Sequence, residues 1–136
     1  IPHSIKYGNH EYKIKTICEH SFKNNSDIRS ISFPQDSELS VIEKYAFYFS
    51  SIEKISIPIS IEKLEGGWNY KATKLTQISL SKYNKNYMFQ NENFIVSKMN
   101  RKSRIYDVFN YLSNTISSIT IPSSIKRIES HSFCCC

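Results

Sequence analysis

The stretch Ile42–Pro58 reads IEKYAFYFSSIEKISIP, and its pattern recurs along most of the 136-residue chain. The pentapeptide Ile-Pro-x-Ser-Ile occurs three times, beginning at Ile1, Ile57 and Ile121. A wider frame of apolar residues, I-x-x-I-x-I, begins at Ile28, Ile52, Leu75 and Ile116. Successive frames are 24, 23 and 41 residues apart, so extra chain lies before the last one. Self-similarity at a near-constant period indicates a stacked repeat architecture.

Each frame has a simple physical interpretation. The alternation I-x-I places two apolar side chains on one face of a short strand, and a following proline ends that strand because it lacks a ladder donor. A second frame, such as Leu39, Ile42 and Phe47, predicts a return segment and an aromatic residue in the turn to the next coil. Stacked coils bury these side chains in one continuous core, with a rise of roughly 4.8 Å per coil. A β-sandwich would explain the alternation but not the repeated pentapeptides.

Two places within the repeats depart from this pattern, besides the segment before the last frame. The sequence Gly66-Gly67-Trp68 brings the aromatic residue one position early, so we expect that turn to be distorted. The segment Ile5–Ile14 is longer than its counterparts and predicts a small excursion around Gly8-Asn9. The chain begins and ends in mid-pattern, so it is expected to be a fragment whose last aromatic residue, Phe133, lacks a covering strand.

These motifs resemble the BspA-like leucine-rich repeats, whose units of about 23 residues read L-x-x-I-x-I-P followed by V-x-x-I-x(4)-F. The stretches Ile42–Pro58 and Ile116–Phe133 match this pattern closely. The resemblance implies an α/β-type but mostly β, right-handed leucine-rich-repeat solenoid with short strands, turns and a β-hairpin insertion. Residues 1–80 would be repeats, 81–115 a basic β-hairpin insertion, and 116–136 the last, truncated repeat. The resemblance also implies adhesion or ligand binding at a cell surface or after secretion, although the fragment shows no targeting signal.

The sequence carries no catalytic signature and implies no cofactor, so we do not expect an enzyme. Its longest apolar runs are a few residues, far short of the ~20 that a membrane helix needs. Cysteine and histidine occur near both ends, but His20 and His131 should lie at least three coils, or roughly 14 Å, apart. We therefore predict no metal site. A local site using His131 and Cys134–Cys136 remains an alternative to small, buried cysteines.

The first candidate binding surface is the outward-facing side of the repeated strands. Side chains between or beside the inward apolar pairs should stack into columns on the inner face of the solenoid, where they would contact a protein or glycan. These side chains are Ser30, Ser32, Lys54, Ser56, Gln77, Ser79, Ser118 and Thr120. Plain strand solubility explains the same residue types equally well.

The second candidate is the insertion. Residues 81–106 contain six Lys and Arg side chains but one carboxylate, Glu92, which leaves a local excess of five positive charges out of the net +6. Lys98, Arg101, Lys102 and Arg104 are the candidate polyanion-binding residues. Aromatic residues are interleaved with these charges, namely Tyr83, Tyr87, Phe89, Phe94 and Tyr106. We favour the simpler interpretation, in which these aromatic side chains pack on the stack of coils and the lysines stay solvated. Binding of nucleic acid is disfavoured, and a purely structural spacer is the third hypothesis.

Overall fold

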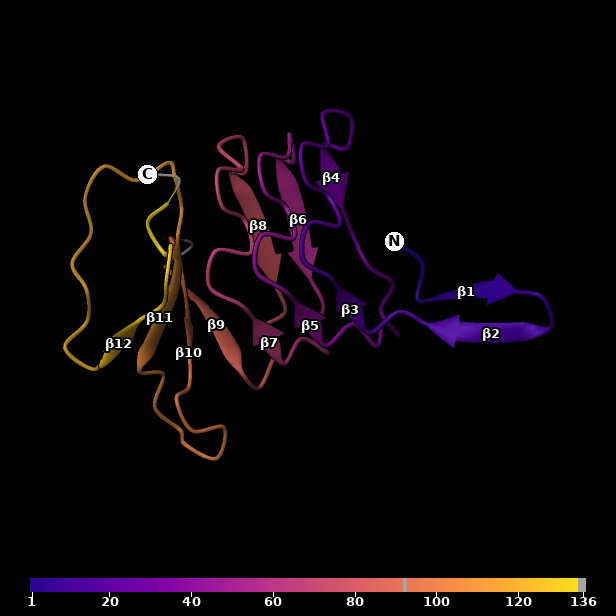
Figure 1. Ribbon diagram of the computed structural model, residues 1–136. Coiled ribbons are helices and arrows are strands. Elements are labelled where there is room, and N and C mark those ends of the chain that lie inside the picture. Colours follow the sequence, from indigo (N-terminus) through magenta and orange to yellow (C-terminus); the bar gives the residue numbers. More distant parts are fainter. Residues whose placement is uncertain (92, 135–136) are drawn as a thin grey trace.

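The computed structural model describes residues 1–91 and 93–134 and shows a β-solenoid of about five turns (Figure 1). Glu92, Cys135 and Cys136 lie outside the described residues. The mostly β repeat solenoid is therefore confirmed. The α/β-type part of the prediction is not supported, because the described residues contain no helix, and the handedness stays a prediction. In particular, these residues contain no helix that could cross a membrane.

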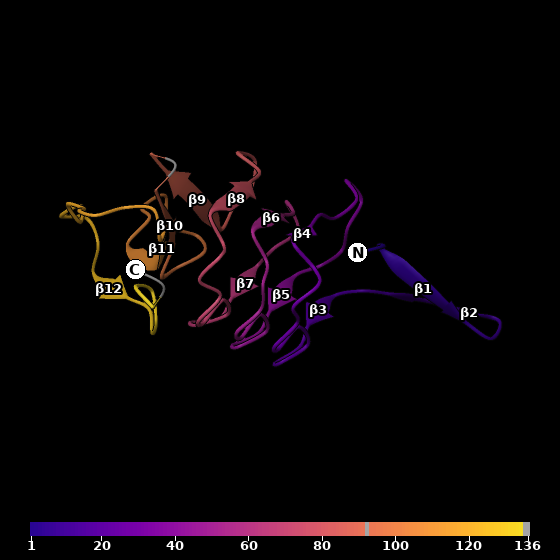
Figure 2. The same ribbon diagram turned by 90° about the horizontal axis from the view of Figure 1, so that it is seen from above.

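The repeated I-x-I frames form a parallel sheet of three strands (Figures 1 and 2). Its strands are β4 (Ser30–Ile31), β6 (Lys54–Ile57) and β8 (Gln77–Leu80). Ile31 pairs with Ile55, which pairs with Ile78, so the register is the one that the repeat spacing predicts. Ile55 and Ile57 are each 2% exposed, which places the apolar column inside the solenoid.

The return segments form a second parallel sheet of three strands. These are β3 (Thr16–Ile17), β5 (Val41–Ile42) and β7 (Lys63–Leu64). Ile17 pairs with Ile42, which pairs with Leu64, and all three side chains are buried. Among the described residues no further strand pairs with β7, and the Leu64 amide donates instead to the Tyr87 hydroxyl at 2.7 Å.

A turn with the same backbone conformation follows each of these three strands. It contains two residues in the left-handed region, four positions apart: His20 and Asn24, Tyr45 and Phe49, and Gly67 and Lys71. The turn at Gly67 is thus regular, and the expected distortion is wrong. Trp68 occupies the position of Ala46 there, because the Phe47 amide donates to the Trp68 carbonyl just as the Phe22 amide donates to the Ala46 carbonyl.

The turn aromatics anchor the core. Phe47 is fully buried, and its ring stacks on Phe22 at 4.9 Å and meets the edge of Trp68 at 5.9 Å, measured between centroids. Trp68 is itself 1% exposed. In the third turn the Trp68 ring, at the position of Ala46 in the second turn, therefore fills the space that Asn69 leaves at the usual aromatic position.

Residues 81–115 form more than a hairpin. They contain an antiparallel meander of β9 (Tyr87–Gln90), β10 (Phe94–Ser97) and β11 (Val108–Leu112). Strand β11 pairs in parallel with β12 (Arg127–Ile128), and the Phe109 ring stacks on Phe133 at 5.1 Å. The segment is therefore part of the stack and not a separate hairpin beside it. Strands β10 and β11 are buried along their whole length because β10 lies between β9 and β11, and the last repeat stacks on β11.

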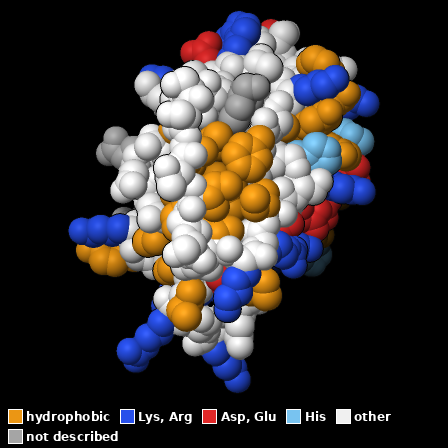
Figure 3. Space-filling view, turned by 90° about the vertical axis from the view of Figure 1, so that its left-hand side faces the viewer, with side chains coloured by type: hydrophobic (Ala, Val, Ile, Leu, Met, Phe, Trp, Pro, Cys, Tyr) orange, Lys and Arg blue, Asp and Glu red, His pale blue; other side chains and the backbone are white. Residues whose placement is uncertain are grey.

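The two ends of the stack differ. The excursion around Gly8 is a hairpin of β1 (Ser4–Tyr7) and β2 (His10–Lys13) that projects from the body (Figures 1 and 2). At the opposite end, hydrophobic side chains gather in the middle of the face (Figure 3). Ile128 is 50% exposed and Phe133 is 38% exposed, so Phe133 is only partly covered, as the sequence predicts.

Candidate functional site

Six of the eight predicted contact residues lie together on the side of the β4-β6-β8 sheet that faces away from the hydrophobic core. Lys54 pairs with Ser30 and with Gln77, and Ser56 pairs with Ser79 in the next coil. All six line one shallow depression of about 260 Å³. We call this surface the serine face; it consists of Ser30, Ser32, Lys54, Ser56, Gln77 and Ser79.

The other two predicted residues are elsewhere. Ser118 and Thr120 belong to a frame that forms no strand, and neither pairs with β8. The expectation that they extend the column is wrong. The physical reason is that the meander, and not the frame at Ile116, follows the third coil in the stack, so that frame becomes an exposed connection to β12.

The serine face is free to make new contacts. Its six side chains make no hydrogen bond or ion pair with another described residue. Five of them are neutral, and Lys54 supplies the one charge. The backbone beneath is held by the parallel ladder, so these donors and acceptors are displayed on a rigid support, which suits recognition by hydrogen bonds.

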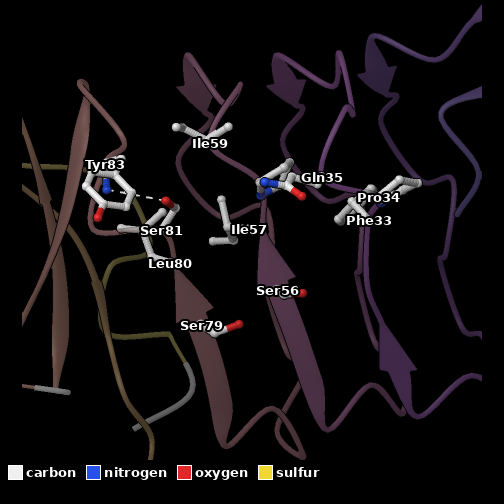
Figure 4. A pocket seen from close by; sticks show the side chains of 11 residues that line it. Phe33, Pro34, Gln35, Ser56, Ile57, Ile59, Ser79, Leu80, Ser81 and Tyr83 are labelled. Carbon is white, nitrogen blue, oxygen red and sulfur yellow. Dashed lines mark hydrogen bonds between the residues drawn. The ribbon is translucent and has the colours of Figure 1, made fainter.

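A groove that the sequence analysis missed adjoins the serine face (Figure 4). It has a volume of about 420 Å³ and lies where three consecutive coils leave the sheet. We call it the proline groove; its lining is Phe33, Pro34, Gln35, Ser56, Ile57, Pro58, Ile59, Ser79, Leu80, Ser81 and Tyr83. Ile59 is 48% and Tyr83 is 69% exposed, so apolar surface is open to solvent here. The signal in the sequence was the proline that follows two of these frames, Pro34 and Pro58, since it ends the strand at the same point in both coils; Ser81 stands at this position in the third coil.

The basic insertion is only partly free. The Arg101 guanidinium donates to the Glu62 carboxylate at 3.0 Å, which ties the β10–β11 loop to the third coil. The Lys98 ammonium lies over the Tyr106 ring, 4.9 Å from its centroid. Lys102 and Arg104 are exposed and form no ion pair with a described residue. Of the four predicted polyanion-binding residues, two are thus already engaged.

A polar crevice of about 320 Å³ separates β7 from the last repeat. A hydrogen bond from Lys63 and one from the Lys44 amide hold the pKa of Glu65 below its usual range. Burial raises the pKa of Tyr87, against the opposing effect of the hydrogen bond from the Leu64 amide. Both groups therefore serve the ladder: Glu65 caps an amide of the preceding turn, and Tyr87 replaces a missing strand partner.

The histidines lie closer together than expected. His20 and His131 both contact Tyr45, with ring centroids 6.0 and 5.9 Å away, so their separation is below the roughly 14 Å that a coil count predicts. The cause is that the last turn packs against Gly67. Cys18 is a free thiol. Within residues 1–91 and 93–134 no group of three His, Cys, Asp or Glu side chains could hold a metal ion, and the alternative site involving Cys135 and Cys136 lies outside those ranges.

Comparison with known proteins gives a consistent result. The sequence profile of the BspA type leucine rich repeat region matches six copies, over residues 3–112 and 102–136. A solved leucine-rich repeat protein from Eubacterium ventriosum has a similar fold, with a TM-score of 0.56 and 21% sequence identity. The similarity covers 89% of this chain but 42% of that one. No curated protein matches the chain.

Proposed function

The chain belongs to the BspA-type leucine-rich repeat family, and from this premise we propose that it is a recognition module that binds a protein or glycan partner through the serine face and the proline groove. The observation that carries the proposal is the continuity of the two surfaces. Ser56 and Ser79 line both of them, so one ligand could contact unpaired hydroxyls and exposed apolar surface together.

The chemistry of the surface favours a protein segment as the main ligand. The proline groove offers apolar walls at Ile57, Leu80 and Tyr83, into which an apolar side chain of the partner would insert. Such buried anchors supply most of the affinity of protein interfaces, and surrounding hydrogen bonds supply orientation. The serine face, with hydroxyls and the Gln77 amide, would orient the partner backbone. A glycan would use the same hydroxyls but would leave the apolar groove unfilled.

The test replaces Ser56 and Ser79, the two residues that the serine face and the proline groove share. A displayed random-peptide library and an immobilised panel of neutral glycans are selected on the native chain, and the selected ligands are titrated against variants. The double variant Ser56→Arg, Ser79→Arg should lower affinity at least tenfold, because two large cations then fill adjacent coils. Each substitution should change the free energy of unfolding by less than about 0.5 kcal/mol, as is usual at surface sites.

The matched control is the double variant Ser118→Arg, Thr120→Arg. It adds the same two cations to exposed hydroxyl residues outside the sheet, so it should leave affinity within twofold of the native value. If the selected ligands bind both double variants equally well, the proposed site is wrong.

Two alternatives remain open to test. Polyanion binding through the insertion is favoured by the unpaired, exposed side chains of Lys102 and Arg104; it predicts steep salt dependence, which nucleic acid would show most strongly. A structural spacer predicts no ligand at all. We further propose that the protein acts without catalysis and is displayed at the cell surface or secreted, which labelling of intact cells that express the full-length protein would test.

A further inference from the structure

Aromatic side chains line the turns that follow β3, β5 and β7. Backbone hydrogen bonds join these turns directly: the Asn24 amide donates to the Tyr48 carbonyl at 2.9 Å, and the Phe49 amide donates to the Tyr70 carbonyl at 3.2 Å. Because the turns share one conformation, equivalent side chains lie above one another. None of them belongs to the serine face or the proline groove.

The rings form two rows. In one row the His20 and Tyr45 rings stack, with centroids 6.0 Å apart and planes 12° from parallel. In the other row Tyr48 and Tyr70 stack at 5.8 Å and 14°. Across the rows, Tyr45 meets Tyr48 edge to face at 6.0 Å. The rows border an open depression of about 320 Å³, which we call the turn trough; its lining is His20, Lys23, Tyr45, Tyr48 and Tyr70.

The last repeat packs beside two of the rings that line this trough. The His131 ring lies 5.9 Å from Tyr45 and 4.6 Å from Tyr70, edge to face in both cases. It reaches this place because Gly67 has no side chain: a Cβ there would lie 3.1 Å from the His131 Nδ1 atom. The last repeat, whose His131 lies 61 residues after Tyr70 in the sequence, thus contacts two of the rings that line the trough.

The charge at the trough is positive. The Lys23 ammonium lies 5.7 Å from the centroid of Tyr48, and the Lys71 ammonium lies 5.6 Å from that of Tyr70. Neither lysine forms an ion pair with a described residue. The nearby carboxylate of Glu19 is already 3.9 Å from the Lys44 ammonium. The Lys23 side chain is exposed, and an ammonium held only over one ring at an exposed site is weakly bound, so it can turn to an anion.

The walls are amphipathic. Tyrosine combines an apolar ring with a hydroxyl at its tip, and the hydroxyls of Tyr45, Tyr48 and Tyr70 make no hydrogen bond with a described residue. Sugars have the matching character, with apolar C–H faces and hydroxyls around the ring edge. The volume is at the lower end of the roughly 300–1,000 Å³ typical of small-ligand sites.

We propose that the turn trough binds the sugar rings of a carboxylated glycan, with the phenol rings against the sugars and Lys23 at a carboxylate. This site is separate from the serine face and does not depend on the function proposed for that face. The competing explanation is a purely structural ladder of rings, which would stabilise the turns and bind nothing.

The experiment titrates the native chain with hyaluronan octasaccharide, and with the same oligosaccharide after chemical reduction of its carboxylates to alcohols. Isothermal calorimetry measures affinity, and thermal melts check folding. The native chain should bind the carboxylated probe at least tenfold more tightly than the reduced probe. The variant Lys23→Gln should remove this preference, and Tyr48→Leu should lower affinity for both probes. Because Lys23→Gln keeps all the rings, it tests the proposal even if Tyr48→Leu is unstable.

Two control variants separate the trough from the other surfaces. Lys82→Gln with Tyr83→Leu removes a similar pair at the proline groove, where the Lys82 ammonium lies 5.1 Å from the Tyr83 centroid. Lys102→Gln with Arg104→Gln removes exposed charge from the insertion. Both should bind the probe within twofold of the native chain. Loss of binding in either control in place of the trough variants overturns the proposal, and so does no detectable binding to the native chain at millimolar probe.

Discussion

Truncation of Phe47 tests whether the stack depends on its turn aromatics. The side chain is fully buried, so Phe47→Ala removes a ring that contacts the turn before it, at Phe22, and the turn after it, at Trp68. Truncation of a buried aromatic residue costs about 3–5 kcal/mol, and this range includes the cavity that remains. Each ring pair contributes about 0.5–1.5 kcal/mol of that loss. Since folded domains are stable by only about 5–15 kcal/mol, the variant should lose a large share of its free energy of unfolding.

The assay is thermal unfolding followed by circular dichroism. For a chain of this length, 1 kcal/mol corresponds to about 3–4 °C in Tm, so Phe47→Ala should melt roughly 9–20 °C below the native chain. The matched control is Phe133→Ala, which removes the same residue type from the same repeat position at the partly covered end. It should cost clearly less, because Phe133 is 38% exposed and stacks on one ring, Phe109.

Tyr48→Ala provides a second control, since Tyr48 is next to Phe47 but only partly buried, and it should be much better tolerated. A melt of Phe47→Ala within a degree of the native chain would refute the assignment of turns to coils on which the whole argument rests.

Three further perturbations follow from the same contacts. Replacement of Arg101, Lys102 and Arg104 by Glu should abolish any dependence of polyanion affinity on ionic strength between low and high salt, because salt screens exposed charges over ~8 Å at physiological ionic strength. The variant should still show a cooperative thermal melt. Because hydrogen bonds lower the folded-state pKa of Glu65, its contribution to stability is present at neutral pH and is lost as pH falls through that pKa. In urea unfolding from pH 7 to pH 3, Glu65→Gln should therefore lose less free energy of unfolding than the native chain, and an equal loss in both would contradict the assignment. Gly67→Ala should lower the free energy of unfolding by more than the roughly 1–2 kcal/mol that a left-handed non-glycine residue costs, since its Cβ would also lie 3.1 Å from His131. Gly8→Ala, whose Cβ would have no atom within 4 Å, should lose only the backbone contribution.

The repeat spacing determined much of this protein. The positions of Ile31, Ile55 and Ile78 in one ladder follow from short-range alternation and a nearly constant period, because each coil can bury its apolar pair only against an identical neighbour in the same register. Burial of Phe47 and the shared face of Ser56 and Ser79 follow from the same rule. These features needed no knowledge of distant contacts.

The tertiary structure decided where the pattern breaks. The 41 residues between the last two frames leave open which segment stacks on the third coil, and burial of β10 and β11 resolves this in favour of the meander. That choice removes Ser118 and Thr120 from the serine face and brings His131 onto Gly67. The turn trough is lined by the first three turns, and this packing places His131 beside two of its rings. A linear pattern records which side chains face inward, whereas the order in which coils stack depends on which apolar surfaces bury each other best in three dimensions.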